Sequence, residues 1–412
     1  FIISALYFNW ISIGSCYKVL RMYFKIKKSK KDLDKKIILL DALNAKSGGA
    51  LVIVDQVINQ FIKHNQDNTK LFVAQLKSSQ KCQVHDRNII RIYVDDKYYN
   101  LFYMAYWHFF KLPYILLKND ISHLVALSGF VFFRYFKHNI KITVTINNVL
   151  PFISKKEKLN YFPRVVSRVK FSLLKKIYCH SIKKSDRIIL PSYYLSNLMQ
   201  KACKCKGKNI QVQLTGCSDS IPLIQNKLNY KNTISLLYLS PIWKYKNHII
   251  LIRALHYLKQ NNSHNFKLYL VGGFLQKNIR KELEQSARNY NVTDNIVFLG
   301  NVDDKVKNEQ LEKADILLFA SKYEANSIIL SEYLACGKLI VSSDSASNKE
   351  ILSNSALYFN NNDHVCAASQ IIRLIEDEKL CEELLKNSKI RVSQLKWDGY
   401  ALNLLDISKS KR

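Results

Sequence analysis

The chain has 412 residues, which is too long for a single hydrophobic core and predicts two domains of ordinary size. Hydrophobic residues make up 48% of the sequence, so most of the chain can fold, and the lack of a fixed-period repeat argues against a solenoid or propeller. The net charge of +31 favours polyanionic partners such as nucleic acid, anionic lipid or phosphorylated substrates.

The first 35 residues combine an apolar stretch, 1–17, with a basic run, 25–31. The apolar stretch is slightly shorter than the ~20 residues of a membrane span, and it lacks the basic-before-apolar order of a signal peptide. Two interpretations stay open for this extension: an interfacial anchor, and a segment without functional importance.

Nine cysteines are scattered along the sequence, and only Cys203 and Cys205 stand close together. A lone C-x-C without a second pair or a histidine cluster is a weak signal for a metal site. We therefore expect free thiols in a reducing cytoplasm.

Short apolar runs alternate with helical spacing from residue 36 to residue 215. The expected strands are 37–41, 71–75, 89–93, 124–127, 142–146, 188–190 and 210–214. The expected helices are 50–61, 98–117, 158–180 and 193–203. This β-α-β order predicts a parallel sheet covered on both faces.

The alternation restarts after a polar stretch, 215–232, which we interpret as a linker. The expected strands are 236–239, 267–271, 296–299, 316–319, 339–342 and 356–359. The expected helices are 248–260, 277–290, 308–313, 327–335, 348–352, 363–386 and 397–407. Two Rossmann-like units follow from this pattern, and ligands of such sheets bind at the carboxyl ends of the strands.

The strongest local signal is the stretch 320–337. A buried strand ends, a polar loop carries Glu324, and Asn326 or Ser327 caps a helix that begins near Ile328. The free amides of that first turn suit a diphosphate, while Glu332, a turn further on, suits ribose hydroxyls and Glu324 a sugar. The alternative interpretation is that both glutamates are solvated surface residues.

Glu324 and Glu332 match the E-x₇-E signature of retaining GT-B glycosyltransferases, and the stretch resembles family 4 of these enzymes, the glycosyl transferases of group 1. The resemblance implies two Rossmann-like domains that face each other across a cleft. It places an acceptor-binding domain at 36–215, a nucleotide-sugar-binding domain at 216–395 and, within 396–412, a C-terminal helix that returns to the first domain.

Two further segments extend the resemblance. Lys246 takes the position of the family lysine that neutralises the donor diphosphate, but Pro241 replaces the family arginine, so Lys244 is a candidate for the second charge. Gly48 and Gly49 lie where the family brings its first domain to the donor phosphates. Ordinary surface lysines and a plain glycine turn are the alternatives.

Other strand ends carry weaker candidates. Asn147 follows the strand at 142–146, where many family members have a histidine that contacts the donor sugar, and an Asx turn without ligand is the alternative. Gly273 follows the strand at 267–271, where the family loop borders the nucleotide.

Basic residues crowd the segment 155–184 and alternate with apolar and aromatic ones. Such a helix can lie on an anionic bilayer and bring a lipid-linked acceptor to the site. A solvated face in a lysine-rich chain is the alternative.

The resemblance implies a hexosyltransferase that moves a sugar from a nucleoside-diphosphate sugar to a glycan or lipid-linked acceptor with retention. We expect Glu324, Lys246 and Asn147 at the reacting sugar, no metal and no cofactor, and no nucleic acid partner. The expected role is lipopolysaccharide or capsule biosynthesis, in the cytoplasm on the inner face of the membrane. Rival interpretations are a nucleotide-sugar epimerase, a non-catalytic scaffold and a basic nucleic-acid-binding protein.

Overall fold

The structure is a computed structural model that describes residues 36–46, 48–65, 69–79, 86–132, 140–162, 165–205, 207–217, 233–276 and 278–407. The chain forms two compact units. The first contains the described parts of 1–145, 180–188 and 404–412, and the second those of 146–179 and 189–403. The expected extension over 1–35 and most of the expected linker, 218–232, lie outside the described residues.

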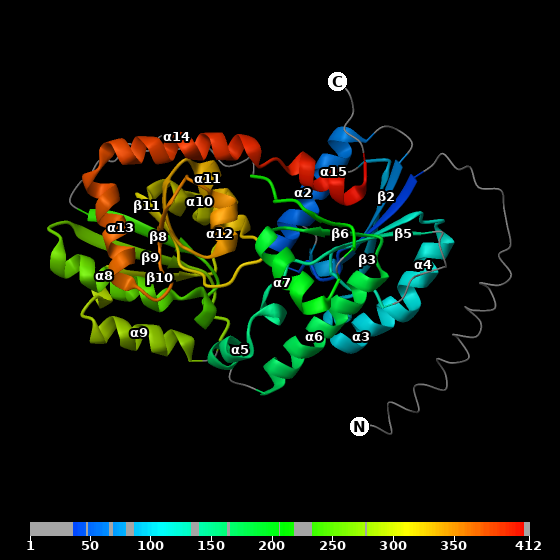
Figure 1. The fold of residues 1–412 in the computed structure, drawn as a ribbon, viewed down its shortest axis with the longest axis horizontal. Coiled ribbons are helices and arrows are strands. Elements are labelled where there is room, and N and C mark those ends of the chain that lie inside the picture. Colours follow the sequence, from blue (N-terminus) through cyan, green and yellow to red (C-terminus); the bar gives the residue numbers. More distant parts are fainter. Residues whose placement is uncertain are drawn as a thin grey trace. The chain divides into compact units, whose positions relative to one another are not determined.

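The first sheet has seven strands in the order β3-β2-β1-β4-β5-β6-β7 (Figure 1). Its strands are β1 (Lys36–Asp41), β2 (Thr69–Leu76), β3 (Ile89–Val94), β4 (His123–Ala126), β5 (Lys141–Thr145), β6 (Arg187–Leu190) and β7 (Ile210–Val212). The pairs β1–β2, β1–β4, β2–β3 and β4–β5 are parallel. All four residues of β4 and of β6 are buried, as expected for strands covered on both faces.

Helices and single turns connect these strands. They are α2 (Gly49–His64), α3 (Leu101–Tyr106), the π-helical turn η3 (Trp107–Lys111), α4 (Leu112–Lys118), α5 (Lys155–Tyr161), α6 (Val165–Lys184) and α7 (Tyr193–Cys203). The helix expected at 98–117 is therefore interrupted. Pro113 lies in the first turn of α4 and has no amide hydrogen to donate, so the regular hydrogen-bond ladder breaks just before it.

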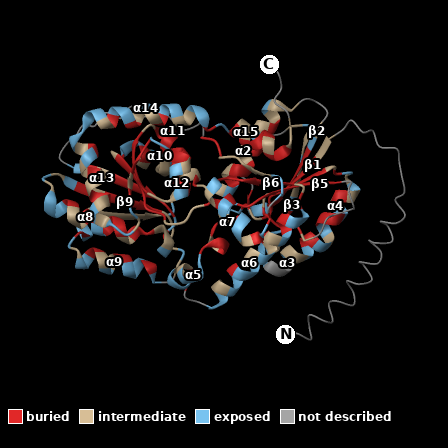
Figure 2. Cartoon of the chain, viewed as in Figure 1, coloured by how far each residue is buried: buried red, intermediate tan, exposed pale blue. Residues whose placement is uncertain are grey.

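The second sheet has six strands in the order β10-β9-β8-β11-β12-β13. Most of it is buried (Figure 2), with β11 and β12 buried at every position and β10 of intermediate exposure throughout. The strands are β8 (Thr233–Leu239), β9 (Asn265–Val271), β10 (Ile296–Gly300), β11 (Ile316–Phe319), β12 (Leu339–Ser343) and β13 (Leu357–Phe359). All five neighbouring pairs are parallel. An apolar core surrounds this sheet, with Tyr238, Phe319 and Tyr333 among its largest fully buried side chains.

Its helices are α8 (His248–Asn261), α9 (Ile279–Asn289), α10 (Asp304–Lys313), α11 (Ile328–Cys336), α12 (Ala346–Leu352), α13 (His364–Glu376), α14 (Glu378–Gln394) and α15 (Trp397–Leu405). The single helix expected at 363–386 is wrong, because Asp377 leaves the helical conformation and its side chain accepts the amide of Leu380 to cap α14. The single helix expected at 158–180 is likewise divided between α5 and α6.

The expectation of free thiols is wrong for one pair of cysteines. Cys179 in the second half of α6 and Cys203 at the end of α7 form a disulfide. Five other cysteines are free thiols: Cys205, Cys217, Cys336, Cys366 and Cys381. The bonded residues are 24 positions apart, and only the packing of α6 against α7 brings them together, so sequence spacing carried no signal for the pair.

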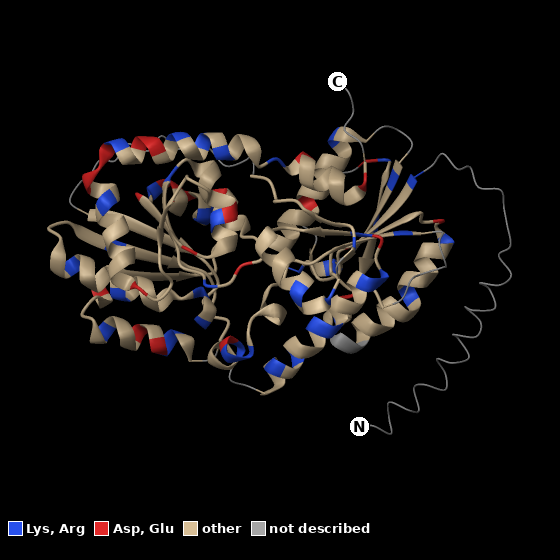
Figure 3. Cartoon of the chain, viewed as in Figure 1, with Lys and Arg blue, Asp and Glu red and all other residues tan. Residues whose placement is uncertain are grey.

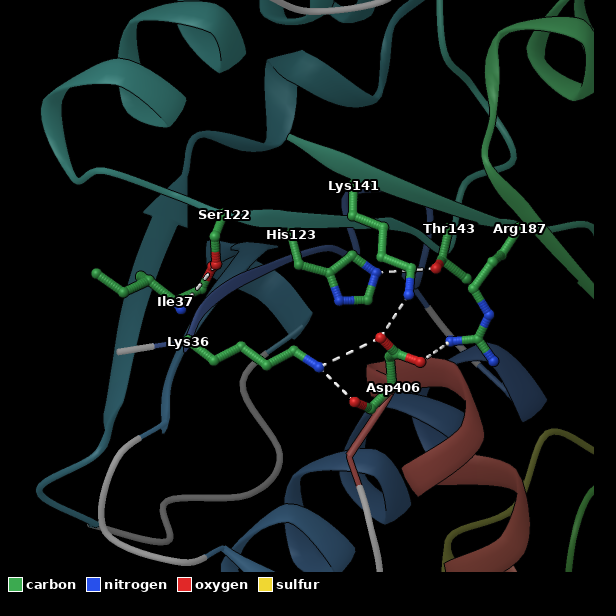
Figure 4. Close-up of polar contacts among 8 residues, drawn as sticks. All are labelled: Lys36, Ile37, Ser122, His123, Lys141, Thr143, Arg187 and Asp406. Atoms are coloured by element: carbon green, nitrogen blue, oxygen red, sulfur yellow. Dashed lines mark hydrogen bonds and ion pairs between the residues drawn. The ribbon is translucent and has the colours of Figure 1, made fainter. Parts of the chain in front are cut away.

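An ionic cluster, which we call the Asp406 cluster, ties the end of the described chain to the first sheet (Figure 4). Lys141 Nζ and Arg187 Nη1 each lie 2.6 Å from a carboxylate oxygen of Asp406, and Lys36 donates to the Asp406 carbonyl. These three cations are the first residues of β5, β6 and β1. Burial opposes ionisation of Asp406, but the bond from Lys141 and the charges of Lys36 and Arg187 hold its pKa below the ordinary value.

Candidate functional site

Two loops of the second unit meet at the carboxyl ends of β8 and β11. These strands are neighbours in the parallel sheet, so the segments that follow them emerge at the same edge. The turn after β8 carries Lys246, and the loop after β11 carries Glu324. Lys246 Nζ lies 2.5 Å from Glu324 Oε1, so the structure brings these two predicted residues together.

The Lys246–Glu324 pair is largely shielded from water. Each of the two side chains is only 13% exposed. Burial alone would lower the pKa of the Lys246 ammonium, but the charge and hydrogen bond of Glu324 together with the nearby Tyr245 and Tyr238 outweigh it and raise that pKa above the ordinary value. Lys246 therefore remains a cation at neutral pH, at a place where charge interactions are stronger than in water.

Backbone contacts fix the turn that presents Lys246. The hydroxyl of Tyr238, which is fully buried in β8, donates to the Lys246 carbonyl at 2.9 Å. Asn247 adopts the left-handed conformation at the start of α8, and its side-chain amide donates to the Asn361 carbonyl at 2.9 Å. The ammonium is thus held on a short, well-supported turn.

The loop that presents Glu324 is held on both sides of this residue. The amide of Lys322 donates to the Tyr245 carbonyl at 3.0 Å, and the Ser192 hydroxyl donates to the Ala325 carbonyl at 2.5 Å. Asn326 donates its side-chain amide to Thr215 Oγ1, also at 2.5 Å. Ser192 and Thr215 were not among the predicted residues, because nothing in the sequence links them to this loop.

Helix α11 begins directly after that loop and leaves its first amides open. Ser327 is the N-cap, with no hydrogen bond from its side chain, and its carbonyl accepts the amides of Leu330 and Ser331. The amides of Ile328 and Ile329 donate to no acceptor among the residues that the structure describes. Such a helix start is suited to an anion.

Glu332 lies further along α11 and is 8% exposed. Both of its carboxylate oxygens lie 3.4 Å from Lys307 Nζ of α10, a partner that the sequence did not predict. Burial raises the pKa of the Glu332 carboxyl, and the charge of Lys307 opposes that rise only in part. The carboxylate is therefore a strong hydrogen-bond acceptor, held in place by a single lysine.

Lys244 points to a different neighbour. Its ammonium lies 3.2 Å from Glu282 of α9, and the two side chains are 42% and 49% exposed. Its backbone amide donates to Gln276 at 2.7 Å. The second positive charge expected from Lys244 thus pairs with α9 in this structure, while Lys246 pairs with Glu324.

The glycines after β9 allow neighbouring strand ends to pack closely. A Cβ atom on Gly272 would lie 2.1 Å from the Ser240 carbonyl oxygen, and φ is +146° there. A Cβ atom on Gly273 would lie 2.7 Å from the side-chain oxygen of Asn301. Side chains at these positions would push apart the loops that follow β8, β9 and β10.

Gly48 and Gly49 stand at the start of α2 in the first unit. Gly48 has φ +63° and serves as the N-cap, and no atom lies within 4 Å of the Cβ position that a side chain would occupy. The open space beside Gly48 leaves the backbone at this helix start accessible.

Asn147 and Asn148 follow β5 and have different environments. Asn147 is exposed, whereas the side chain of Asn148 accepts the Leu150 amide at 3.1 Å. That bond makes an Asx turn, so Asn148 rather than Asn147 has the structural role that was the alternative to ligand contact. Asn147 is left as the candidate for ligand contact.

Residues 220–391 match the family model described as Glycosyl transferases group 1. Over 197 residues the chain is 25% identical to an uncharacterized glycosyltransferase of Methanocaldococcus jannaschii, covering 45% of this chain and 49% of that one. Over 231 residues it is 26% identical to Protein CapJ of Staphylococcus aureus, covering 55% and 54%. The chain thus spans about half the length of these curated relatives.

Solved glycosyltransferase structures share the fold over nearly the whole chain. A glycosyltransferase from Rickettsia africae aligns with TM-score 0.64 at 18% identity, covering 90% of this chain and 96% of that one. WaaG, a glycosyltransferase involved in lipopolysaccharide biosynthesis, aligns with TM-score 0.66 at 13% identity over 90% and 98%. Anabaena HepE in complex with UDP-glucose aligns with TM-score 0.62 at 16% identity, covering 90% of this chain and 98% of that one. With the two parallel sheets, this confirms the predicted GT-B fold class.

Proposed function

We propose that this protein is a glycosyltransferase that moves a sugar from a nucleoside-diphosphate sugar to an acceptor. The observation that carries the proposal is the shielded Lys246–Glu324 pair, in which Glu324 lies on the loop that leads into the open amides of α11. The match of residues 220–391 to the group 1 glycosyl transferases supports it independently.

The leaving diphosphate is the charge that this site suits best. In the proposed mechanism the phosphate oxygens bind at the amides of Ile328 and Ile329, and Lys246 moves from Glu324 to the phosphate that departs. The fixed amide dipoles stabilise the developing charge without reorganisation, which is the largest single contribution in many enzymes, and Lys246 adds a cation once it has changed partner. We propose that Glu332 then holds the ribose, Glu324 the transferred sugar, and that no metal ion is required.

The stereochemistry and the substrates extend this proposal. We propose transfer with retention of configuration, because the Glu324–Glu332 spacing resembles the retaining family. Since HepE was solved with UDP-glucose and WaaG acts in lipopolysaccharide biosynthesis, a UDP-hexose is the first donor to test. A glycan or lipid-linked acceptor of a surface polysaccharide is the proposed second substrate.

An exposed apolar face on α6 supports a membrane-bound acceptor. The exposed fractions are 63% for Val165, 79% for Val166, 60% for Val169 and 45% for Leu173. These residues follow helical spacing and lie on one side of the helix. The aromatic residues Phe162 and Phe171 of this segment do not belong to the exposed face, because both are buried.

Exposed lysines accompany this face, and α5 and α6 carry a concentration of basic residues in Figure 3. Lys155, Lys156, Lys170 and Lys176 are exposed, whereas Lys158 is buried and donates to the Pro151 carbonyl at 2.6 Å. Among the residues that the structure describes, no helix combines the length and apolarity needed to cross a bilayer. The exposed valines and lysines of α5 and α6 are the basis on which we propose contact with the surface of an anionic membrane.

Vesicle binding tests the membrane proposal. Vesicles that contain phosphatidylglycerol should bind the protein more tightly than pure phosphatidylcholine, with the difference reduced by salt. Val165→Ser with Val169→Ser should weaken binding about tenfold through lost apolar burial. Val365→Ser, at a 38% exposed valine of α13, is the matched control. Equal binding of both vesicles, or of all variants, would contradict this part of the proposal.

A thermal-shift screen against UDP-, GDP-, ADP- and dTDP-sugars tests the donor site. One nucleotide class should raise the melting temperature of the wild type but not of Lys246→Ala or Glu332→Ala, while the exposed Lys281→Ala responds normally. Turnover of that donor should persist in EDTA and require an acceptor. Equal shifts in all variants would refute the site, and an isomerised donor formed without acceptor would favour an epimerase.

A further inference from the structure

A second carboxylate reaches the loop that carries Glu324. Glu157 of α5 accepts a hydrogen bond from the hydroxyl of Tyr323, the residue directly before Glu324. The two residues stand 166 positions apart in sequence. We propose that Glu157 and Tyr323 are positioning residues that set the place of Glu324 in the donor site, an inference that rests on the proposed function.

Both oxygens of the Glu157 carboxylate are engaged. Oε2 accepts the backbone amide of Ser154 at 2.8 Å, and the Ser154 hydroxyl accepts the Glu157 amide at 3.2 Å, which completes a capping box at the start of α5. Oε1 accepts from Tyr323. The carboxylate cannot rotate without breaking one of these bonds, so it is a rigid anchor for the tyrosine.

Ring contacts add to this anchor. The ring of Tyr161, at the end of α5, meets the Tyr323 ring edge-on with centroids 5.8 Å apart. Lys322 Nζ lies 5.8 Å from the centroid of the same Tyr161 ring. Helix α5 therefore holds both residues that precede Glu324, while the Ser192 hydroxyl holds Ala325, which follows it.

The charge state of the anchor is fixed at neutral pH. Burial and the Glu157 carboxylate raise the pKa of Tyr323, so its phenol keeps the proton that it donates. Burial opposes ionisation of Glu157, but the bonds from Tyr323 and Ser154 hold its pKa below the ordinary value. The bond thus joins a protonated phenol to a carboxylate across the working pH range, and it is charge-assisted.

The position of the loop decides how Glu324 performs its proposed role. Glu324 must release Lys246 to the diphosphate and still reach the sugar, so its backbone has to stay in place while its side chain changes partner. Misplacement of a catalytic group by about 1 Å can cost on the order of a hundredfold in rate. Glu157 touches no reacting group and acts only through Tyr323.

The test compares two conservative variants. Tyr323→Phe keeps the ring contacts and removes the hydroxyl, whereas Ser154→Ala removes one bond of the capping box and leaves Tyr323 untouched. We expect Tyr323→Phe to lower kcat by about tenfold or more with little change in the donor KM, and Ser154→Ala to lower kcat less than about twofold. Glu157→Gln, which keeps an acceptor oxygen, should retain more activity than Glu157→Ala.

Hydrogen exchange provides a readout that needs no activity. Amides of residues 322–327 should exchange faster in Tyr323→Phe than in the wild type, and at the wild-type rate in Ser154→Ala. Unchanged exchange and kcat in Tyr323→Phe would overturn the inference. A joint fall of kcat, donor binding and melting temperature would also overturn it, because that pattern indicates a merely structural contact. If the wild type turned over no donor, the proposed function would be refuted. The exchange rates of residues 322–327 would then still test whether Glu157 and Tyr323 hold the loop in place.

Discussion

Two ionic clusters of this molecule differ in composition and in their place on a sheet. The Lys246–Glu324 pair matches one cation to one carboxylate, with both side chains 13% exposed, beyond the carboxyl ends of β8 and β11. The Asp406 cluster joins one carboxylate to three cations that stand at the amino ends of their strands, and Asp406 is 33% exposed.

The different positions of the two clusters indicate which charges can interact with a ligand. Ligands of parallel sheets bind at the carboxyl edge, where loops and helix starts converge, so a balanced pair there can exchange partners when a ligand enters. At the amino edge, Asp406 neutralises only part of a basic row and fixes the chain end in place. We therefore expect the first cluster to govern activity and the second to govern stability.

The largest expected effect is on activity at the balanced pair. Lys246→Met should lower kcat/KM by about a hundredfold to a thousandfold, as for the loss of one essential electrostatic donor. It should also destabilise the fold, because the Glu324 charge is left without its partner. The double variant Lys246→Met, Glu324→Gln should regain stability without regaining activity, as measured by urea unfolding and donor turnover.

A double variant that recovers both quantities would contradict this expectation, since the pair would then be a structural contact. Single variants that lose stability alone would lead to the same conclusion.

Asp406→Ala should have the next largest effect, on stability. It leaves three cations close together and should lower the free energy of unfolding by about 2 kcal/mol at pH 7, with kcat changed less than about twofold. The folded-state pKa of Asp406 is depressed, so its contribution is present above its ordinary pKa of 3.8 and is lost as pH falls through the folded value. Urea unfolding of the two proteins should therefore converge in acid.

The exposed Asp294 provides the control, because Asp294→Ala removes one carboxylate without touching the cluster. If the two alanine variants lost equal stability, the Asp406 cluster would have no special role.

A smaller, pH-dependent effect is expected at Asp41, which is fully buried at the end of β1. Burial raises the pKa of Asp41 from 3.8 to about 7, and its neighbour His108 is neutral because burial lowers the pKa of that imidazole to about 3. The ionisation penalty is absent below pH 3.8 and complete above pH 7. Asp41→Asn should therefore gain stability relative to wild type as the pH rises from 5 to about 7, with little further gain up to pH 8. Parallel stability curves over that range would exclude an ionisation at this site.

The smallest effect is expected at Lys244. Its partner Glu282 and its own side chain are both well exposed, and such pairs contribute little. Lys244→Ala should change kcat/KM by about threefold, against the much larger loss at Lys246. A loss of more than tenfold in donor kinetics would mean that Lys244 turns from Glu282 to the diphosphate when donor binds.

Sequence patterns predicted those parts of the candidate site that lie within one continuous segment. The strand at 316–319, the following loop and the helix with Gly337 as its end were readable, since each depends on neighbours in sequence. The break at Asp377 could have been found from its capping preference, and the capping box of Ser154 and Glu157 also has a recognisable spacing.

Partners from distant segments were not predictable. The pairing of Glu332 with Lys307, the bond from Tyr323 to Glu157 and the Cys179–Cys203 disulfide depend on how helices pack, which single-sequence spacing does not encode. Lys244 and Lys246 are two residues apart on one short turn, yet they meet different carboxylates. The predicted domain boundaries and the ligand roles of the site residues stay predictions.

The Asp406 cluster has a consequence for folding during synthesis on the ribosome. Lys36 and Asp406 are 370 positions apart, so a ribosome has to make nearly all of the second unit before Asp406 emerges to meet the strands of the first. Until that moment Lys36, Lys141 and Arg187 of the nascent first unit lack the Asp406 carboxylate. The part of the molecule that is synthesised first is therefore the part that is completed last.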